Sequence, residues 1–296
     1  METELLKKYN TAAPRYTSYP TVPYWDNEKF TTNNWLSALL RSYNLAKDEG
    51  IGIYIHLPFC ESLCTYCGCN TRITKNHGVE TPYINALIKE WEMYCRLIGE
   101  RPKIKELHLG GGTPTFFSAE NLQRLISSIL GDQQSTDTSF SFEGHPDNTS
   151  LAHLKALYQF GFTRLSLGIQ DFDPKVQMMI NRFQTPAQVA YITNEARNLG
   201  YDSINFDLIY GLPGQTLTGL SETIFEVIKM LPERIAFYSY AHVPWLKPGQ
   251  RHYADKDIPQ GDEKFALYQL GRDLLLDAGY QEIGMDHFAL PQDGLF

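Results

Sequence analysis

A strand and a cysteine loop stand next to each other in one stretch of this chain: IGIYIHLPFCESLCTYCGCN, residues 51–70. Its first seven residues, 51–57, are apolar and rich in β-branched side chains, which predicts a buried strand. Three cysteines follow at Cys60, Cys64 and Cys67, with the spacing C-x3-C-x2-C. Three thiolates on one short loop can hold three irons of a four-iron cluster and leave the fourth iron open for a ligand that reacts.

Two other kinds of metal site could use the same cysteines, a structural zinc site and a ferredoxin cluster. Structural zinc usually takes four ligands in two separated pairs, and here Cys69 and His77 could complete only an unusual single-loop site. A ferredoxin cluster takes a fourth cysteine followed by proline, whereas Cys69 is followed by Asn70. Four of the five cysteines lie within residues 60–69, which is typical of a metal site and not of a disulfide framework. The pattern therefore favours an open iron-sulfur cluster.

Length and charge limit the classes of partner. The chain has 296 residues, 43% of them hydrophobic, which is enough for a large buried core. With 26 Lys and Arg against 34 Asp and Glu the net charge is −8, and there is no long basic run, so we expect neither nucleic acid nor a membrane as a partner. No apolar run approaches the roughly 18 residues of a membrane span, and the start is not signal-like, so we expect a cytoplasmic protein.

Strand-like and helical segments alternate along the chain. Strands are predicted at 51–57, 104–109, 139–143, 164–168, 203–209 and 234–240, with helices at about 83–97, 118–130, 150–160, 187–199 and 217–230. This alternation predicts right-handed crossovers and a parallel sheet, closed or nearly closed into a barrel. We therefore expect an α/β fold, a partial (β/α)6 barrel with active residues at the C-terminal ends of its strands.

The chain is expected to have three parts: an N-terminal arm (1–45), the barrel (46–245) and a C-terminal extension of the barrel (246–296). Within the arm, residues 9–21 contain aromatic residues, two prolines and no helical period, which predicts an extended segment. The extension is predicted to hold a helix at about 261–279 and a short strand at 280–284. Its ending on Leu295 and Phe296 without a cap suggests an incomplete chain.

Three glycines, Gly110 to Gly112, follow the second predicted strand. They lack the G-x-G-x-x-G spacing and the Lys-Ser/Thr pair of phosphate loops, so a nucleotide phosphate is not indicated. Without side chains, the backbone at this strand end can be approached closely by a small polar group. We therefore expect the glycines to bring backbone groups to a ligand.

These motifs together resemble one known family. The cysteine spacing, with Tyr66 before the last cysteine and Gly-Gly-Gly-Thr-Pro after the next strand, resembles the radical S-adenosylmethionine (SAM) enzymes. More narrowly, the chain resembles the oxygen-independent coproporphyrinogen III oxidase family in YIHLPFC (54–60), CGCN (67–70), GIQDF (168–172), DLIYGLP (207–213), GMDHF (284–288) and the arm motif PRYTSYP (14–20). The resemblance extends over nearly the whole chain and implies a radical SAM barrel.

The resemblance implies a radical reaction in heme biosynthesis. In this family the open iron of a 4Fe-4S cluster is chelated by SAM, and an electron from the cluster cleaves SAM to methionine and a 5′-deoxyadenosyl radical. The radical takes a hydrogen from a propionate side chain, and loss of carbon dioxide and one further electron leaves a vinyl group. Two rounds convert coproporphyrinogen III to protoporphyrinogen IX without oxygen. The family also implies a reducing electron donor such as flavodoxin or ferredoxin, and we expect a monomer.

The resemblance further implies roles for individual residues. The cluster ligands would be Cys60, Cys64 and Cys67. One SAM molecule would contact Tyr54, Gly111 and Glu143, and a second would contact Tyr66, Gly112, Thr113, Gln170, Arg182, Asp207 and Ala241. Whether one or two molecules bind is left open. His56 alternates with Tyr54 along the predicted strand and so shares its face; it is a candidate catalytic residue, with a packed core histidine as the alternative.

An acidic protein must counter the four carboxylates of this substrate locally. Arg15, Arg72, Lys75 and Arg182 are the cations predicted to receive the propionates.

The chain departs from the family in two places. It has Glu-Gly-His-Pro at 143–146 where the family usually has Glu-Val-Asp-Pro, and it stops soon after Phe288, before the glycine-rich segment and the helical C-terminal domain of the family. Two alternatives to the oxidase therefore stay open: a heme chaperone-like radical SAM relative, and a catalytically incomplete fragment that binds the cluster. The CGCN segment and the arm motif argue against the chaperone, because such relatives generally lack both.

Overall fold

The structure is a computed structural model, which describes Glu4, Lys8 and residues 20–26, 28, 30–133 and 137–295. The chain forms two compact units, residues 1–49 and residues 50–296. Arg15 and all of the predicted extended segment except Pro20 and Thr21 lie outside the described residues.

The first unit contains a helix that the sequence analysis did not predict, α2 (Thr32–Ala46). It follows a short 3-10 helix, η1 (Val22–Tyr24). The helix begins where the side chain of Thr31 accepts a hydrogen bond from the backbone N–H of Asn34, which satisfies one of the free donors of the first turn.

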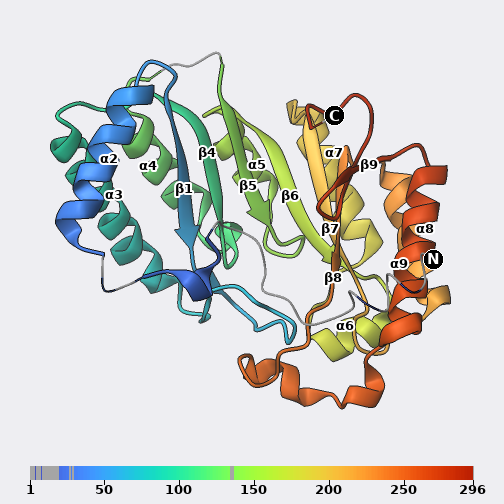
Figure 1. Ribbon diagram of the computed structural model, residues 1–296. Helices are drawn as coiled ribbons and strands as arrows, with labels where there is room; N and C mark the ends of the chain where they lie inside the picture. The colour runs from blue at the N-terminus through green and yellow to red at the C-terminus, as the bar shows by residue number, and fades with distance from the viewer. Residues whose placement is uncertain are drawn as a thin grey trace. The chain divides into compact units, whose positions relative to one another are not determined.

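The second unit is built on one eight-stranded sheet (Figure 1). Six parallel strands lie in chain order: β1 (Ile51–Leu57), β4 (Ile104–Gly111), β5 (Ser139–Gly144), β6 (Phe162–Gln170), β7 (Ser203–Tyr210) and β8 (Arg234–Ser239). Two antiparallel strands continue it, β10 (His287–Ala289) and then β9 (Gln281–Gly284). Within the described residues β1 and β9 are the two edges of the sheet. The predicted α/β fold with a parallel sheet is therefore confirmed, as an open, partial barrel.

Helices connect the parallel strands and cover one side of the sheet. They are α3 (Glu80–Ile98), α4 (Ala119–Leu130), α5 (Leu151–Tyr158), α7 (Pro186–Leu199), α8 (Leu217–Met230) and α9 (Gly261–Asp277), with the short α6 (Pro174–Ile180) and the 3-10 turns η2 (His77–Val79), η3 (Pro114–Phe116), η4 (Pro248–His252) and η5 (Asp255–Asp257). Side-chain caps mark several starts: Ser118, Ser150, Thr185 and Thr216 each accept a backbone N–H of the first turn. Among the described residues, no helix combines the length and apolarity that crossing a membrane requires.

The two faces of the parallel strands differ in chemistry. On β6, Leu165 and Leu167 are fully buried in the apolar core that the strands share with the helices. Ser166 and Gly168 alternate with them and face a cavity on the other side. Because successive side chains of a strand point to opposite faces, the sheet buries one face against the helices and presents the other, more polar face to the site.

The contact between α9 and β8 leads to a prediction. A methyl group at Gly271 would lie 2.4 Å from Cζ and 2.5 Å from Cε1 of the buried Phe237 ring. Replacing a helical glycine by alanine ordinarily gains about 1 kcal/mol, but overpacking a core costs about 1–3 kcal/mol. Because 2.4 Å is far inside van der Waals contact, the overpacking cost here belongs at the upper end, about 2–3 kcal/mol, so Gly271→Ala should lower the free energy of unfolding by about 1–2 kcal/mol in urea titrations.

Gly294→Ala is the control, because no atom lies within 4 Å of a methyl group there. Its free energy of unfolding should stay within about 0.5 kcal/mol of wild type. A Gly271→Ala protein as stable as wild type would contradict the packing argument.

Candidate functional site

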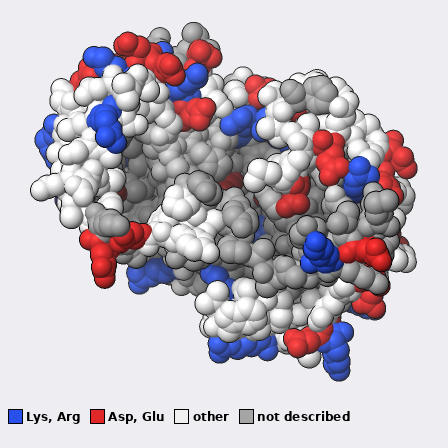
Figure 2. All heavy atoms as spheres, in the orientation of Figure 1, with Lys and Arg blue, Asp and Glu red and all other residues white. Residues whose placement is uncertain are grey.

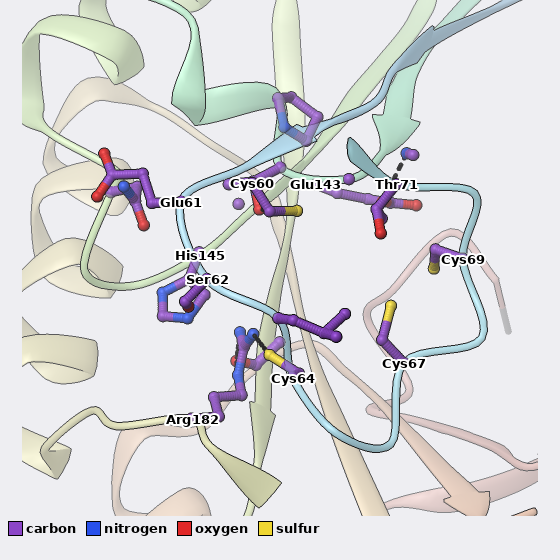
Figure 3. Close-up of a pocket in the computed structure, with 18 of the residues that line it drawn as sticks. Cys60, Glu61, Ser62, Cys64, Cys67, Cys69, Thr71, Glu143, His145 and Arg182 are labelled. Atoms are coloured by element: carbon purple, nitrogen blue, oxygen red, sulfur yellow. Dashed lines mark hydrogen bonds between the residues drawn. The ribbon is translucent and has the colours of Figure 1, made fainter. Parts of the chain in front are cut away.

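A cavity of about 200 Å³ lies at the C-terminal ends of the parallel strands (Figure 3). Its wall is formed by the cysteine loop, by the residues that join β4 to η3, and by the ends of β5, β6 and β7. Segments far apart in the chain therefore meet here, as expected for a site at the carboxyl ends of a parallel sheet.

The cysteine loop is fixed at its base and along its length. At the base, β2 (Phe59–Cys60) pairs with β3 (Arg72–Ile73), which closes the loop. Along the loop, the N–H of Thr65 donates to the carbonyl of Ile180 at 3.0 Å, and the amide of Asn181 donates to the carbonyl of Leu63 at 2.8 Å. The C-terminal end of α6, a helix that sequence reasoning missed, thus supports the loop.

Four cysteines of this loop line the cavity: Cys60, Cys64, Cys67 and Cys69. All four are free thiols. Figure 3 shows them on the cysteine loop around the cavity, with Cys60 and Cys64 on separate parts of its wall. Among the described residues no three His, Cys, Asp or Glu side chains are grouped to hold a single metal ion. A four-iron cluster does not need its ligands grouped around one point, since each thiolate binds a different iron. The spaced thiols of this loop fit such a cluster.

One of the thiols, that of Cys67, has neighbours that favour the thiolate form. A hydrogen bond from the Cys69 thiol lowers the pKa of Cys67 to about 6; burial opposes this shift, and the cations Lys247 and Arg182 add to it. The Cys64 sulfur lies 3.6 Å from Nη1 of Arg182, which donates to it. Thiolates bind iron. In contrast, burial raises the pKa of Cys60, whose sulfur lies 3.3 Å from the hydroxyl of Thr113.

Arg182 joins the sheet to the cysteine loop. Its Nε donates to the carbonyl of Gly168 at 3.2 Å, its Nη2 donates to the same oxygen, and its Nη1 faces Cys64 (Figure 3). Burial alone would lower the pKa of this arginine, but the neighbouring Tyr66, Cys64 and Asp207 outweigh burial, so the pKa is raised. The guanidinium is therefore a permanent positive charge beside the cysteines.

Close packing within the protein requires glycine at all three positions of the glycine run. A methyl group at Gly110 would lie 2.9 Å from Oε1 of Glu143, one at Gly111 would lie 2.8 Å from the His56 ring, and one at Gly112 would lie 2.6 Å from the carbonyl of Pro58. The space that the missing side chains leave is filled by the protein itself. Gly111 also has a φ of +120°, in the region that favours glycine. Gly111 and Gly112 nevertheless line the cavity.

Glu143 and Tyr54 meet at this glycine run. Oε2 of Glu143 accepts the N–H of Gly111 at 3.2 Å. The Tyr54 hydroxyl lies 3.1 Å from Nδ1 of His56, and Nε2 of His56 lies 2.8 Å from the carbonyl of Asn70. Since that carbonyl only accepts, Nε2 carries the proton, and Nδ1 accepts from Tyr54. His56 is thus held at both nitrogens, between β1 and the end of the cysteine loop.

Most of the predicted cofactor-binding residues line the cavity: Tyr66, Gly111, Gly112, Thr113, Glu143, Gln170, Arg182 and Asp207. Tyr54, His56 and Ala241 do not line it. Ala241 is linked to its wall through Gln250, whose amide donates to the carbonyl of Ala241 at 3.1 Å and to that of Tyr66 at 3.5 Å. The roles of these residues toward a cofactor stay predictions.

The cavity also contains residues that sequence reasoning did not select, among them Ser62, Thr71, Asn148 and Ser166. Ser166 could have been found, because it lies two positions before Gly168 on the same strand face. His145, which replaces the aspartate of the family, lines the cavity as well. Burial, with Arg182 nearby, lowers its pKa to about 3, so the ring is neutral at pH 7.

Comparison with known proteins agrees with the site. The family model of the Radical SAM superfamily matches residues 54–227. The chain is 40% identical to the oxygen-independent coproporphyrinogen III oxidase of Pseudomonas aeruginosa, over 99% of this chain and 64% of that protein. It is 38% identical to the protein of the same name from Escherichia coli, over 98% of this chain and 63% of that protein. A solved structure of coproporphyrinogen III oxidase from Escherichia coli, a radical SAM enzyme, superposes with a TM-score of 0.88 at 36% identity, covering 98% of this chain and 64% of that chain.

The chain belongs to the radical SAM superfamily. Membership implies a 4Fe-4S cluster and SAM. The relatives to which the chain is similar are oxygen-independent coproporphyrinogen III oxidases, and the chain spans less than two thirds of their length.

Asp207 gives a prediction on pH. Burial, with a smaller contribution from the nearby Glu143, raises the pKa of this carboxyl from 3.8 to about 6, although Asn205 and Ser166 donate hydrogen bonds to it. Between pH 4 and 6 the native state therefore holds more protons than the unfolded state, so this group's contribution to stability falls as pH rises. In iron-free Asp207→Asn we expect this fall in stability to disappear. Between pH 4 and pH 7 the free energy of unfolding of wild type should therefore fall by about 1–3 kcal/mol more than that of the variant.

The measurement is the free energy of unfolding in urea at several pH values from 4 to 7. Equal slopes against pH for the variant and wild type would show that Asp207 titrates normally.

Proposed function

We propose that this chain carries the radical SAM part of an oxygen-independent coproporphyrinogen III oxidase, an oxidoreductase that converts coproporphyrinogen III to protoporphyrinogen IX in heme biosynthesis. One observation carries the proposal: three free cysteines with C-x3-C-x2-C spacing line a cavity at the carboxyl ends of a parallel sheet. The 40% identity to a named oxidase over 99% of the chain supports the choice of substrate.

In this proposal Cys60, Cys64 and Cys67 are the three cluster ligands. Cys69 remains a thiol, since the hydrogen bond to Cys67 and burial raise its pKa. When bound, the reduced cluster supplies the electron that cleaves SAM and so starts the oxidative decarboxylation of the propionates. A flavodoxin or ferredoxin would deliver that electron, and the chain would act as a monomer.

The chain's own residues bind and orient the cofactor. Glu143 offers a carboxylate, which can accept charge-assisted hydrogen bonds from an ammonium group or from ribose hydroxyls. Gly111 holds that carboxylate through its N–H, and Tyr54 and Glu143 both pack against Gly110. Gln170, Arg182 and Asp207 form a second polar group on the cavity wall. That group supports a second SAM site, with Tyr66, Gly112, Thr113 and Ala241.

His56 is the proposed catalytic residue on β1. Its Nδ1 accepts from Tyr54, the proposed SAM contact, and its Nε2 donates to the cysteine loop at Asn70. His56 therefore links Tyr54 to the cysteine loop and can fix the position of Tyr54 relative to that loop.

The proposal predicts cluster formation and SAM cleavage. Anaerobic reconstitution with iron and sulfide, then dithionite, SAM and coproporphyrinogen III, should yield 5′-deoxyadenosine and a vinyl product. Cys64→Ala should lose the brown chromophore and all cleavage, because one cluster corner has no ligand. Cys69→Ala should keep the chromophore and its iron content, because only three sulfurs bind iron.

Each alternative function predicts a different result, in the reconstitution assay, in a heme titration or in a metal analysis. Heme binding on titration, without vinyl product, would favour the heme chaperone-like relative. A cluster that leaves SAM uncleaved under dithionite would favour the incomplete, cluster-binding fragment. Zinc in the purified protein, with no iron uptake, would exclude the proposed chemistry.

The substrate's carboxylates must be recognised by individual cations. Figure 2 shows Lys and Arg side chains interspersed with Asp and Glu on the face in view. Arg182 is buried and already bound to Gly168 and Cys64. Arg72 is exposed between Thr71 and Ile73, which line the cavity, and Lys75 is exposed two residues after Ile73, so these two cations are the stronger candidates.

The double variant Arg72→Glu, Lys75→Glu should raise the KM for coproporphyrinogen III by about tenfold, since two exposed ion pairs, each worth roughly 0.2–1 kcal/mol, are replaced by repulsion. Cleavage of SAM without substrate should not change. Substrate kinetics identical to wild type would refute the assignment of these cations.

A further inference from the structure

We propose that His108 is a positioning residue for Glu143, and that it fixes the Glu143 carboxylate in the orientation that receives SAM. The proposal rests on the proposed function and deepens it. His108 belongs to neither the predicted site nor the cavity wall, and it acts through Glu143.

His108 lies on β4, between the two strands that carry the proposed SAM contacts. Its register partners are Tyr54 on β1 and Ser141 on β5. Glu143 lies two residues after Ser141, so its side chain is on the same face of β5. Three neighbouring strands therefore bring Tyr54, His108 and Glu143 side by side on the polar face of the sheet.

The imidazole contacts both neighbours. Nε2 lies 3.3 Å from Oε1 of Glu143, and Nδ1 lies 2.7 Å from the hydroxyl of Ser141. The ring is stacked on Tyr54, with ring centroids 5.8 Å apart and planes inclined by 20°. The stacking on Tyr54 thus restricts the tilt of the His108 ring, and the hydrogen bond to Ser141 restricts its rotation.

The proton on Nε2 follows from these partners. An ionised carboxylate only accepts hydrogen bonds, so Nε2 carries the hydrogen that it donates to Glu143. In the neutral ring, Nδ1 then accepts the hydroxyl hydrogen of Ser141; in the charged ring, it donates to the same oxygen. Either form of His108 keeps the donor toward Glu143.

Both carboxylate oxygens of Glu143 are held. His108 holds Oε1, and the N–H of Gly111 holds Oε2 at 3.2 Å. The absent side chain of Gly110 provides the space, since Oε1 of Glu143 and Cε2 of Tyr54 each lie 2.9 Å from where its methyl group would be. A carboxylate has about four lone-pair sites, so those that His108 and Gly111 leave free can accept a ligand's ammonium or hydroxyl hydrogens.

Positioning of this kind affects affinity through preorganisation. A free glutamate side chain loses rotamer entropy when it binds a ligand, whereas one that is already held loses less. Removing the donor on His108 should therefore weaken SAM binding without removing any atom that touches SAM.

Two variants of His108 separate the donor from the ring. His108→Phe keeps an aromatic ring to stack on Tyr54 but has no donor. His108→Gln can place its amide nitrogen where Nε2 lies and keeps the donor. The dissociation constant of SAM is measured by equilibrium dialysis of the anaerobically reconstituted chain, and iron content is measured on the same samples.

We expect the dissociation constant to rise about tenfold in His108→Phe, equivalent to about 1.4 kcal/mol, and to stay within about threefold of wild type in His108→Gln. Iron content should equal that of wild type in both. Ser141→Ala, which removes only the anchor on Nδ1, should raise the dissociation constant by a smaller factor, and it tests the proposal if His108→Phe does not fold.

Three results would overturn the proposal. If His108→Phe, or Ser141→Ala in its place, binds SAM as tightly as wild type, Glu143 does not need this support. If His108→Phe and His108→Gln weaken SAM binding equally, the hydrogen-bond donor of His108 does not support Glu143. If the wild-type chain with a full cluster does not bind SAM at all, the proposed function fails together with this inference.

Discussion

The buried guanidinium of Arg182 connects two parts of the site that the chain keeps more than 100 residues apart. It donates to the carbonyl at the end of β6 and to the sulfur of Cys64. A buried charge is costly unless it is paired and hydrogen-bonded, and its pairing here includes the cysteine loop itself. The loop and the sheet therefore depend on each other: the buried arginine needs the Cys64 sulfur on the loop as an acceptor, and the loop is tied to β6 through the arginine.

The period of the strands decides which residues reach the cavity. On β6 the buried leucines alternate with Ser166 and Gly168, and on β7 the apolar Phe206 and Leu208 flank Asp207. One face packs on the helices while the other presents oxygen and nitrogen atoms to the cavity. The same alternation places His108 beside Glu143. A sheet with this register can thus carry a polar site on one side of an apolar core without exposing that core.

The glycine run has a packing role that local sequence does not reveal. Gly111 and Gly112 line the cavity, so their expected approach to a ligand stays a prediction. The contacts that exclude side chains there come from Glu143, His56 and Pro58, which lie 32 or more residues away along the chain. Local sequence contains no sign of such neighbours, because they arrive only when β1, β4 and β5 pair.

The sequence by itself determined the alternation of strands and helices, the strand at 51–57 to the residue, the cysteine spacing and the superfamily, because hydrophobic period and motif spacing are local properties. It missed α6 and β10, which are short. It also missed His108, and it missed α2 although Trp35, Leu39 and Tyr43 recur there at helical spacing. Only the tertiary structure decided that α6 supports the cysteine loop, that Arg182 faces Cys64, and that His108 holds Glu143. Those contacts depend on strand register and on the packing of distant segments, and neither is encoded in the neighbouring residues alone.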